Sequence, residues 1–281
     1  GKKAARVTLP EAPQPMVTMA VQPKARADEQ KIAEALRKLE AEDPTFRVVY
    51  VPETHELVMN GMSDLHLQVV ESRLKRRYGV EITTHVPRIA YRETITRPSE
   101  GHHRHKKQTG GRGQFGDCWL RVEPVPRGTG FEFVNAIRGG SIPTKFIPPI
   151  EKGIVETMEK GVLAGYHMMD IRATAFDGSY HDVDSSDIAF KLAGSLAFKS
   201  CCEKAGLVLL EPIMNVEVTV PDQFTGDVMG DLNARRGRIM GMEVQGNLQV
   251  IKAQAPQAEM YKYSNSLRSI TQGRGFFTME F

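Results

Sequence analysis

The chain has 281 residues, 41% of them hydrophobic and 25% charged, with a formal net charge of +3 and three cysteines. Its length allows two or three domains of roughly 100–200 residues, and it contains no run of about 18 uncharged apolar residues, which excludes a membrane-spanning helix. Cys201 and Cys202 are adjacent and Cys118 lies far away, so they form neither a disulfide framework nor a CxxC metal motif. A reducing, cytoplasmic setting is therefore expected.

The first 87 residues predict the order strand, helix, strand, strand, helix, strand. Ile32 and Leu36 lie at helical spacing in the first helix, and Asp28 is placed to cap it. Ser63 is expected to begin the second helix and Gly79 to end it. A βαββαβ order is typical of a split sandwich with two helices on one face of a sheet. The expected strands are 15–24, 46–53, 55–62 and 81–87, and the expected helices are 28–43 and 63–78.

Residues 211–281 predict the same order, with a hairpin at Gly246 and Asn247. Two βαββαβ units in one chain amount to a weak internal repeat. The expected strands here are 213–221, 237–246, 247–257 and 274–281, and the expected helices are 222–236 and 259–273.

The segment between them, 88–210, has a different pattern. Apolar residues cover more than one face of its second helix, which should therefore be largely buried. Asp184 and Asp187 suit the first turn of that helix, and Asp184 is expected to be its cap. The expected strands are 88–96, 115–125, 131–137 and 167–176, and the expected helices are 146–160 and 186–204.

Positive charge is concentrated in residues 88–116, which hold seven Lys or Arg against two Glu. Residues 211–281, in contrast, hold seven basic and eight acidic residues. A local basic segment in a nearly neutral chain suggests contact with a polyanion at one place. A solvated loop explains the same charges equally well, so both interpretations remain open.

Residues 111–116, Gly-Arg-Gly-Gln-Phe-Gly, match the GxGxxG pattern of dinucleotide sites. Such a site needs a strand before the motif and a helix after it, whereas here a strand is expected to follow. A flexible hairpin tip, with cations that neutralise phosphates, is the better interpretation. The sequence contains no GxxxxGK[ST] phosphate-binding motif.

Three histidines, His102, His103 and His105, raise the question of a metal site. No Cys or carboxylate lies at ligand spacing, so a solvated basic loop is favoured. His181 precedes two aspartates in His-Asp-Val-Asp, but no second carboxylate–histidine cluster supports metal-dependent hydrolysis. No catalytic residue and no metal ligand is therefore assigned, and the adjacent cysteines are expected to fill a core.

Several strings, taken together and in order, carry a specific resemblance. They are AEDPTFRVV (41–49), GMSDLHLQVV (61–70), HKKQTGGRGQFG (105–116), DGSYHDVDSSDIAFKLAGS (177–195), LEPIMNVEV (210–218), GDLNARRGRIMGM (230–242) and TQGRG (271–275). Over essentially the whole chain they resemble domains three to five of elongation factor G, a family of translational GTPases. The resemblance implies an α+β chain in which two ferredoxin-like βαββαβ sandwiches flank a domain similar to ribosomal protein S5. The implied boundaries are a linker at 1–14, domain three at 15–87, domain four at 88–210 and domain five at 211–281.

The resemblance also implies RNA-contacting residues at the tip of domain four, which in this family mimics a tRNA anticodon arm in the decoding site. Two loops would form that tip: Gln108, Thr109, Gly110, Gly111, Arg112, Gly113 and Gln114 in the first, and Asp177, Gly178 and His181 in the second. Further RNA contacts are expected from cations near the tip and in domain five, namely Arg104, Lys106, Lys107, Arg235, Arg236 and Arg238.

By the same resemblance the partners would be the ribosome, with its RNA and proteins, and the tRNA–mRNA duplex, and the protein would be a cytoplasmic monomer. No cofactor is expected in this chain, because GTP and Mg²⁺ would bind an N-terminal domain that these residues do not include. The chain begins at Gly1 without a signal-peptide core and is expected to be part of a longer protein. A ribosome-recycling paralogue, a standalone RNA-binding module and a metal- or nucleotide-dependent enzyme remain alternatives.

Overall fold

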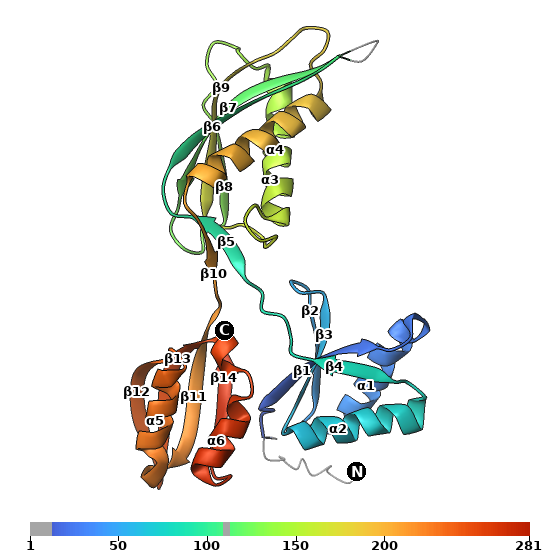
Figure 1. Cartoon of the computed structure of the whole chain (residues 1–281), viewed down its shortest axis with the longest axis vertical. Helices are drawn as coiled ribbons and strands as arrows, with labels where there is room; N and C mark the ends of the chain where they lie inside the picture. Colours follow the sequence, from blue (N-terminus) through green and yellow to red (C-terminus); the bar gives the residue numbers. More distant parts are fainter. Residues whose placement is uncertain (1–12, 109–112) are drawn as a thin grey trace, which may run out of the picture. The chain divides into compact units, whose positions relative to one another are not determined.

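The computed structural model describes residues 13–108 and 113–281. The chain divides into two compact units, one formed by residues up to Ala90 together with Pro212–Phe281, and the other by Tyr91–Glu211. The strands of the described residues form three four-stranded sheets and one two-stranded pair (Figure 1). None of the helices in this part of the chain is long and apolar enough to cross a membrane.

The first four-stranded sheet has the order β2-β3-β1-β4, and all its pairs are antiparallel. Apolar residues of both helices, including Leu36 and Leu67, pack with Met59 of the sheet in one core. This packing is the predicted split sandwich. The elements are β1 (Val17–Pro23), α1 (Glu29–Glu42), β2 (Arg47–Val51), β3 (Glu56–Gly61), α2 (Asp64–Arg73) and β4 (Ile82–His85).

The two predicted helix caps in this sandwich differ in outcome. Ser63 caps α2 as expected, because its side chain accepts a 3.0 Å hydrogen bond from the His66 N–H. Asp28 precedes α1 but makes no capping bond with its side chain. Its φ of −97° and ψ of 1° place it in a preceding 3₁₀ turn, whereas a capping residue is normally extended.

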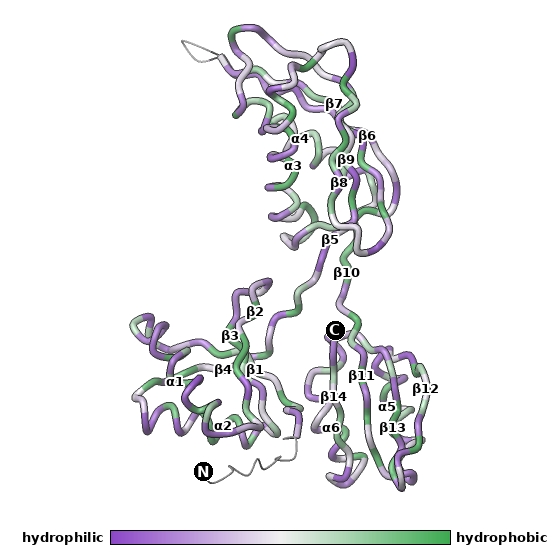
Figure 2. The backbone as a smooth tube through the Cα atoms, turned by 180° about the vertical axis from the view of Figure 1, so that it is seen from behind, coloured by the Kyte–Doolittle hydropathy of each residue, from purple (hydrophilic) through white to green (hydrophobic). Residues whose placement is uncertain are grey.

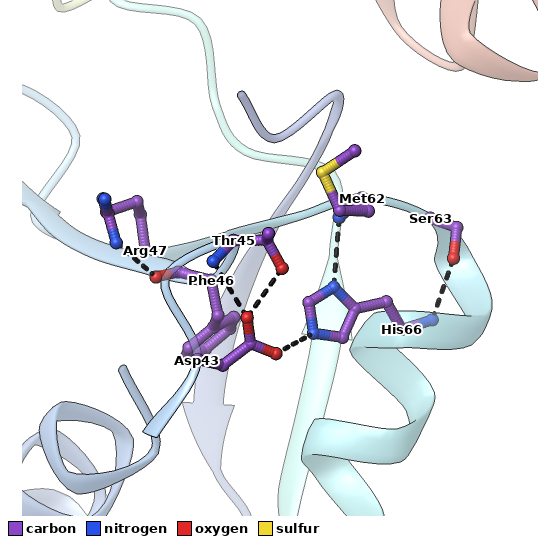
Figure 3. A network of polar contacts seen from close by, with 7 residues as sticks. All are labelled: Asp43, Thr45, Phe46, Arg47, Met62, Ser63 and His66. Carbon is purple, nitrogen blue, oxygen red and sulfur yellow. Dashed lines mark hydrogen bonds and ion pairs between the residues drawn. The ribbon is translucent and has the colours of Figure 1, made fainter. Parts of the chain in front are cut away.

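A His–Asp pair ties α2 to the loop after α1 (Figure 3). Nδ1 of His66 accepts from the Met62 N–H at 3.1 Å, and Nε2 donates to Asp43 at 3.1 Å. The other carboxylate oxygen of Asp43 accepts from the N–H and the hydroxyl of Thr45, at 2.8 and 2.6 Å. These bonds, the Thr45 hydroxyl first, hold the pKa of Asp43 below its usual value despite partial burial. Because both polar atoms of each side chain are engaged locally, the pair is structural.

The last four-stranded sheet has the order β12-β13-β11-β14, the same arrangement as the first sheet. β1 and β14 belong to different sheets, so the two βαββαβ segments do not share strands. Gly246 turns the predicted β12–β13 hairpin with a φ of 65°. The elements are β11 (Ile213–Pro221), α5 (Thr225–Ala234), β12 (Arg238–Gln245), β13 (Leu248–Pro256), α6 (Tyr263–Thr271) and β14 (Phe276–Glu280).

The 91–211 unit is built on the sheet β6-β7-β9-β8, in which β8 and β9 are parallel and joined through α3. Helices α3 and α4 cover one face of this sheet, and hydrophobic residues recur along both helices (Figures 1 and 2). The elements are β5 (Arg92–Ile95), β6 (Ser99–Lys107), β7 (Gln114–Pro124), β8 (Phe131–Asn135), α3 (Ile147–Lys160), β9 (Ile171–Ser179), α4 (Asp187–Lys204) and β10 (Leu207–Leu210).

Helix α4 of this unit is buried on one face only. Ala193 and Ala197 are buried, but Ile188, Leu192 and Leu196 are 64%, 38% and 40% exposed. The prediction of a largely buried helix is therefore wrong for that side.

The adjacent cysteines lie in the core of this unit, as predicted. Cys118, Cys201 and Cys202 are fully buried among Leu120, Phe198 and other apolar side chains. Burial raises the pKa of Cys201 to about 12, so the thiol stays protonated and behaves as a small apolar group.

Two buried carboxylates organise the base of this unit, at the start of β9. Glu93 accepts four backbone N–H bonds of 2.7–3.0 Å from the loop after α3. Asp170 has a left-handed φ of 60° and accepts from the N–H groups of Gly128 and Gly130, each at 3.0 Å. Both residues are completely buried, so these bonds replace the water that each carboxylate has lost.

The sequence interpretation missed two strands of this unit, β6 and β10. The histidine-rich stretch was expected to be a solvated loop, but Ser99–Lys107 pairs with β7 over nine residues. Polar side chains on both faces hid the period of two by which a strand is recognised. β10 has four residues and pairs only with β5 in the described structure. A continuous apolar run this short has no periodicity by which a strand could be recognised.

Candidate nucleic-acid interface

The two loops singled out in the sequence meet at the end of β9 opposite to Glu93. Gly113 donates its N–H to Asp184 Oδ1 at 3.0 Å, and the Phe115 N–H donates to the Asp184 carbonyl at 2.8 Å. Phe115 also forms an isolated parallel bridge with Ser185. Thr109, Gly110, Gly111 and Arg112 lie outside the described residues. The start of β7 and the segment before α4 therefore form one surface, which we call the tip (residues 113–116 and 177–186).

Asp184 holds the tip together and does not cap α4. The cap is Ser186, whose hydroxyl accepts a 3.3 Å bond from the Ala189 N–H, while Asp187 occupies the first turn. Ser186 has the extended backbone of a capping residue and directly precedes the helix. Asp184 lies two residues too early to cap the helix, and its carboxylate is used to bind the other loop.

His181 is exposed at the tip, as expected, with 56% of its side chain accessible. Nδ1 lies 3.3 Å from the N–H groups of Val183 and Asp184, and the His181 N–H donates to the Ser185 hydroxyl at 2.9 Å. Nδ1 is thus an acceptor, which assigns the ring proton of the neutral imidazole to Nε2. The local bonds orient the ring and leave a donor for a partner outside the chain.

Asp177 and Gly178 lie on β9 itself, because this strand continues to Ser179, three residues past the expected strand end at 176. Gly178 is needed for close packing, since a Cβ there would lie 2.2 Å from the Asp117 carbonyl oxygen. Asp177 is exposed, and its carboxylate accepts from the Gly178 N–H at 2.8 Å. Asp177 is therefore the residue of this pair that presents its side chain to solvent.

Asp117 anchors the basic strand β6, a role that the sequence interpretation missed. This buried carboxylate accepts from His102 Nε2, from Arg104 Nη2 at 3.1 Å and from the Ser179 hydroxyl at 2.6 Å. Burial raises the pKa of Asp117, but the three hydrogen bonds together lower it further, so the carboxylate is charged. Asp117 lies two residues before Trp119 on β7, so the two side chains share one face of the sheet. This spacing was the only feature of the sequence that placed Asp117 on the same face as side chains of β6.

The predicted cations fall into two groups. Arg104, Lys106 and Lys107 on β6 are exposed, with Lys107 next to Gln108 at the start of the glycine loop. His105 in the same strand bonds Gln114 at 2.9 Å, which closes the base of that hairpin. These residues give the tip a positive border suited to phosphate groups.

The second group lies at the end of α5 and the start of β12, and its side chains are less available to bind RNA. Arg235 donates to Asp231, to the Glu259 carbonyl and to the Ser266 hydroxyl, at 2.9, 2.7 and 2.8 Å. Arg236 pairs with the Glu259 carboxylate at 2.9 Å, whereas Arg238 is exposed. Arg235 is therefore mainly a structural residue.

The tip presents hydrogen-bond donors to a ligand, and the cations beside it belong to β6. No group of three or more His, Cys, Asp or Glu side chains in residues 13–108 and 113–281 is arranged to hold a metal ion. The GxGxxG match continues into a strand, β7, so its described part lacks the helix that a pyrophosphate site requires. The chemistry available at this surface is the binding of phosphates and hydroxyls.

Three family models match consecutive parts of the chain. They are described as "Elongation Factor G, domain III" for residues 12–86, "Elongation factor G, domain IV" for 87–206 and "Elongation factor G C-terminus" for 208–281. The tip lies within the second of these matches.

Individual proteins give the same result. The chain is 53% identical to an elongation factor G of Aquifex pyrophilus over 272 residues, which cover 96% of this chain and 39% of the relative. It also matches a crystal structure of a protein from Thermus thermophilus with a TM-score of 0.82 and 47% identity, over 100% of this chain and 42% of the other. The chain thus spans about two fifths of the length of both relatives. It belongs to the elongation factor G family and corresponds to the domain III, domain IV and C-terminal regions of that family.

Proposed function

We propose that these residues form the ribosome-binding part of a translation elongation factor that promotes GTP-dependent movement of tRNA and mRNA. In this proposal residues 15–87, 88–210 and 211–281 act as three domains, which agree closely with the matched ranges 12–86, 87–206 and 208–281. The tip of the middle domain enters the decoding site and holds the tRNA–mRNA duplex. The protein is a monomer in the cytoplasm.

The observation that carries this proposal is the joined tip itself. Asp184 fixes the start of β7 beside the segment that presents His181, so the glycine loop and the histidine act at one place. His181, Lys106 and Lys107 offer donors to phosphates and 2′-hydroxyl groups, the features by which a protein grips an RNA duplex without reading its sequence. Binding is the function of this surface, and no bond is made or broken there.

GTP and Mg²⁺ bind outside these 281 residues in our proposal, since the chain has no GxxxxGK[ST] motif to surround a triphosphate. Isothermal titration of the 281-residue protein with GTP and Mg²⁺ should show no saturable binding. A saturable isotherm would contradict this division of labour.

The central test is His181→Ala in an elongation factor G that carries these residues. Loss of one or two polar contacts to RNA is worth about 1–3 kcal/mol if the contacts are charge-assisted. We expect tRNA–mRNA movement to slow about 5- to 100-fold if those contacts act mainly in the transition state. Ribosome-stimulated GTP hydrolysis should be unchanged, because His181 takes no part in nucleotide chemistry.

Both rates are to be measured on one preparation whose melting temperature matches that of the parent protein. Gln30→Ala, a substitution of an exposed residue on α1, serves as a control for handling and folding. Equal loss of both rates, or loss of neither, would show that His181 has no role specific to movement.

A further inference from the structure

The sheet face opposite to α3 and α4 carries a cluster of aromatic side chains that neither helix covers. Trp119 on β7 is 40% exposed, although it lies on a central strand. His102 stacks on it from β6, with ring centroids 4.3 Å apart and an interplanar angle of 21°. Phe176 on β9 also lies beside Trp119, with ring centroids 6.4 Å apart. Three neighbouring strands thus contribute to one aromatic surface, which we call the platform (His102, Trp119 and Phe176).

Strand register explains why these rings meet. His102 pairs directly with Trp119, so their side chains leave the sheet on the same side. The register of β7 against β9 shifts between Trp119 and Leu120, which leaves Phe176 without a direct partner in this ladder and brings it beside Trp119. Such a bulge redirects side chains and is often found near functional sites.

Hydrogen bonds and cations hold the platform in place. His102 donates to the buried carboxylate of Asp117, so its ring cannot turn freely beneath the indole. The guanidinium of Arg121 lies 5.4 Å from the centre of the Phe176 ring and bonds Glu100 at 2.7 Å. The rings are therefore pre-organised, which reduces the entropy lost when a flat ligand stacks on them.

Charge on this face is uneven along the strands. Arg104 and Lys106 lie on the same face of β6 as His102, so this strand is positively charged between the platform and the tip. Asp177, which pairs with Trp119 across the sheet, adds one exposed carboxylate beside the platform. Acidic residues, Glu100, Glu123 and Glu132, occupy the other part, where they pair with Arg121 and Arg172. At the tip, the ring centroids of Phe115 and His181 are 6.3 Å apart, so aromatic rings continue from the tip toward the platform.

We propose that the platform binds unpaired RNA nucleotides, whose bases stack on Trp119 while Arg104 and Lys106 contact the adjoining phosphates. Aromatic rings flanked by cations on an open four-stranded sheet are a common solution for single-stranded RNA, because every base has a face that can stack. Unpaired nucleotides fit better than a protein segment, because the basic part of this face adjoins the tip and a polyanion can follow both. The proposal rests on the RNA-binding function proposed above and extends it from a duplex at the tip to a single strand beside it.

Trp119 is the only tryptophan in the chain, so its emission reports on this site alone. We expect titration of the 281-residue protein with a twelve-residue oligouridylate, which has no stable secondary structure, to quench Trp119 in a saturable manner. The midpoint should rise with salt, since phosphate contacts release counterions. An absence of quenching at concentrations where the labelled oligonucleotide binds the protein would overturn the proposal.

Variants test the stacking directly, with affinity measured by the anisotropy of a labelled oligouridylate. Trp119→Ala should weaken binding about 5- to 100-fold, the range for loss of one base–aromatic stack. Trp119→Phe should retain most of the affinity, because it keeps an aromatic face. The matched control is Val134→Ala, a substitution of another exposed apolar residue in the same sheet. Equal affinity of Trp119→Ala and Val134→Ala would overturn the proposal, provided that circular dichroism shows both folded.

Two further outcomes separate this proposal from its alternatives. Quenching of Trp119 by an acidic peptide, with none by the oligouridylate, would assign the face to a protein partner and overturn the proposal. Oligouridylate could fail to quench Trp119 in the 281-residue protein while His181→Ala still slows tRNA–mRNA movement. That result would overturn the proposal for the platform and leave the function proposed for the tip intact. Quenching that persists in His181→Ala would support the platform as a separate site.

Discussion

The two ends of strand β9 are held by carboxylates in different ways. At the base, Glu93 is fully buried and accepts four backbone N–H bonds from a single loop. At the tip, Asp184 is partly exposed, and within residues 13–108 and 113–281 its carboxylate accepts one backbone N–H bond, from Gly113. Backbone donors that are buried need an acceptor inside the protein, whereas donors near the surface can bond water or a ligand.

This difference separates a closed base from a tip that has donors near the surface, where our proposal places RNA. At the base, the four N–H groups bonded to Glu93 are satisfied within the protein, so these bonds contribute to stability. In our proposal the tip presents His181 to RNA, and the donors that it offers there are left out of internal hydrogen bonds.

The largest effect is expected from Glu93→Gln. The amide can keep one oxygen acceptor but directs an NH₂ group at the two other N–H donors, so buried polar groups lose their partners. The free energy of unfolding at pH 7 should fall by about 3 kcal/mol. Denaturant unfolding followed by Trp119 emission measures this change, because Trp119 lies in the same unit. If Glu93→Gln lowered the free energy of unfolding by less than about 0.5 kcal/mol, the base would not differ from the tip in stability.

The Glu93 effect should depend on pH. Burial raises the pKa of Glu93, but the four backbone N–H bonds together lower it by more, so the folded-state pKa lies below the usual value. The stabilisation is therefore complete above the unfolded pKa of about 4.3 and is lost as pH falls through the folded pKa. The gap in unfolding free energy between the parent and Glu93→Gln should narrow below about pH 4.3. A gap that stays constant from about pH 7 to pH 3 would show that charge is not its cause.

Gly116→Ala should also destabilise the unit, by about 1–3 kcal/mol, because α4 passes too close for a side chain. A Cβ at this position would lie 2.7 Å from the carbonyl group of Ala189 and 2.9 Å from the Phe190 nitrogen. The matched control is Gly226→Ala on α5, where a Cβ meets nothing within 4 Å. That change should stabilise by about 0.5–1 kcal/mol in thermal unfolding, since alanine favours helix. Equal effects of the two substitutions would mean that Gly116 is not a close contact.

Ser186→Ala should cost about 1 kcal/mol, because it removes the cap of α4. Ser186→Asp is the matched variant, since aspartate can accept the same bond from the Ala189 N–H. Both are measured by urea unfolding at one pH. If Ser186→Asp were as unstable as Ser186→Ala, the hydroxyl would not be acting as a cap.

The smallest effect is expected from Asp184→Asn, within about 0.5 kcal/mol, since the amide oxygen can still accept from the Gly113 N–H. A loss of charge alone should hardly affect a single partly exposed bond. Asp184→Ala removes the bond and should cost about 1 kcal/mol. If Asp184→Asn lowered the free energy of unfolding by about 3 kcal/mol, the Asp184 carboxylate would be as important for stability as that of Glu93, and the contrast would fail.

The helices and strands that could be predicted from the sequence are those whose apolar residues repeat at regular helical or strand spacing. Both βαββαβ segments and the hairpin at Gly246 follow the predictions closely, because local spacing and turn residues specify them. The position of α4 was also predicted, but its burial was overestimated, since Ile188, Leu192 and Leu196 are exposed. The strings around the glycine loop and His181 also indicated the family, since each combines several residues in a specific order. The exposure of His181 follows the same expectation.

Tertiary structure decided the contacts that join distant segments. The role of Asp184 depends on Gly113, which lies 71 positions away, and the role of Asp117 depends on β6 and β9 at once. The platform requires one register between β6 and β7 and a bulge opposite β9, and neither leaves a local signal. Propensity and periodicity report how a residue relates to its own helix or strand. Which buried carboxylate meets which backbone donor is settled only when strands pair and the loops between them are brought together.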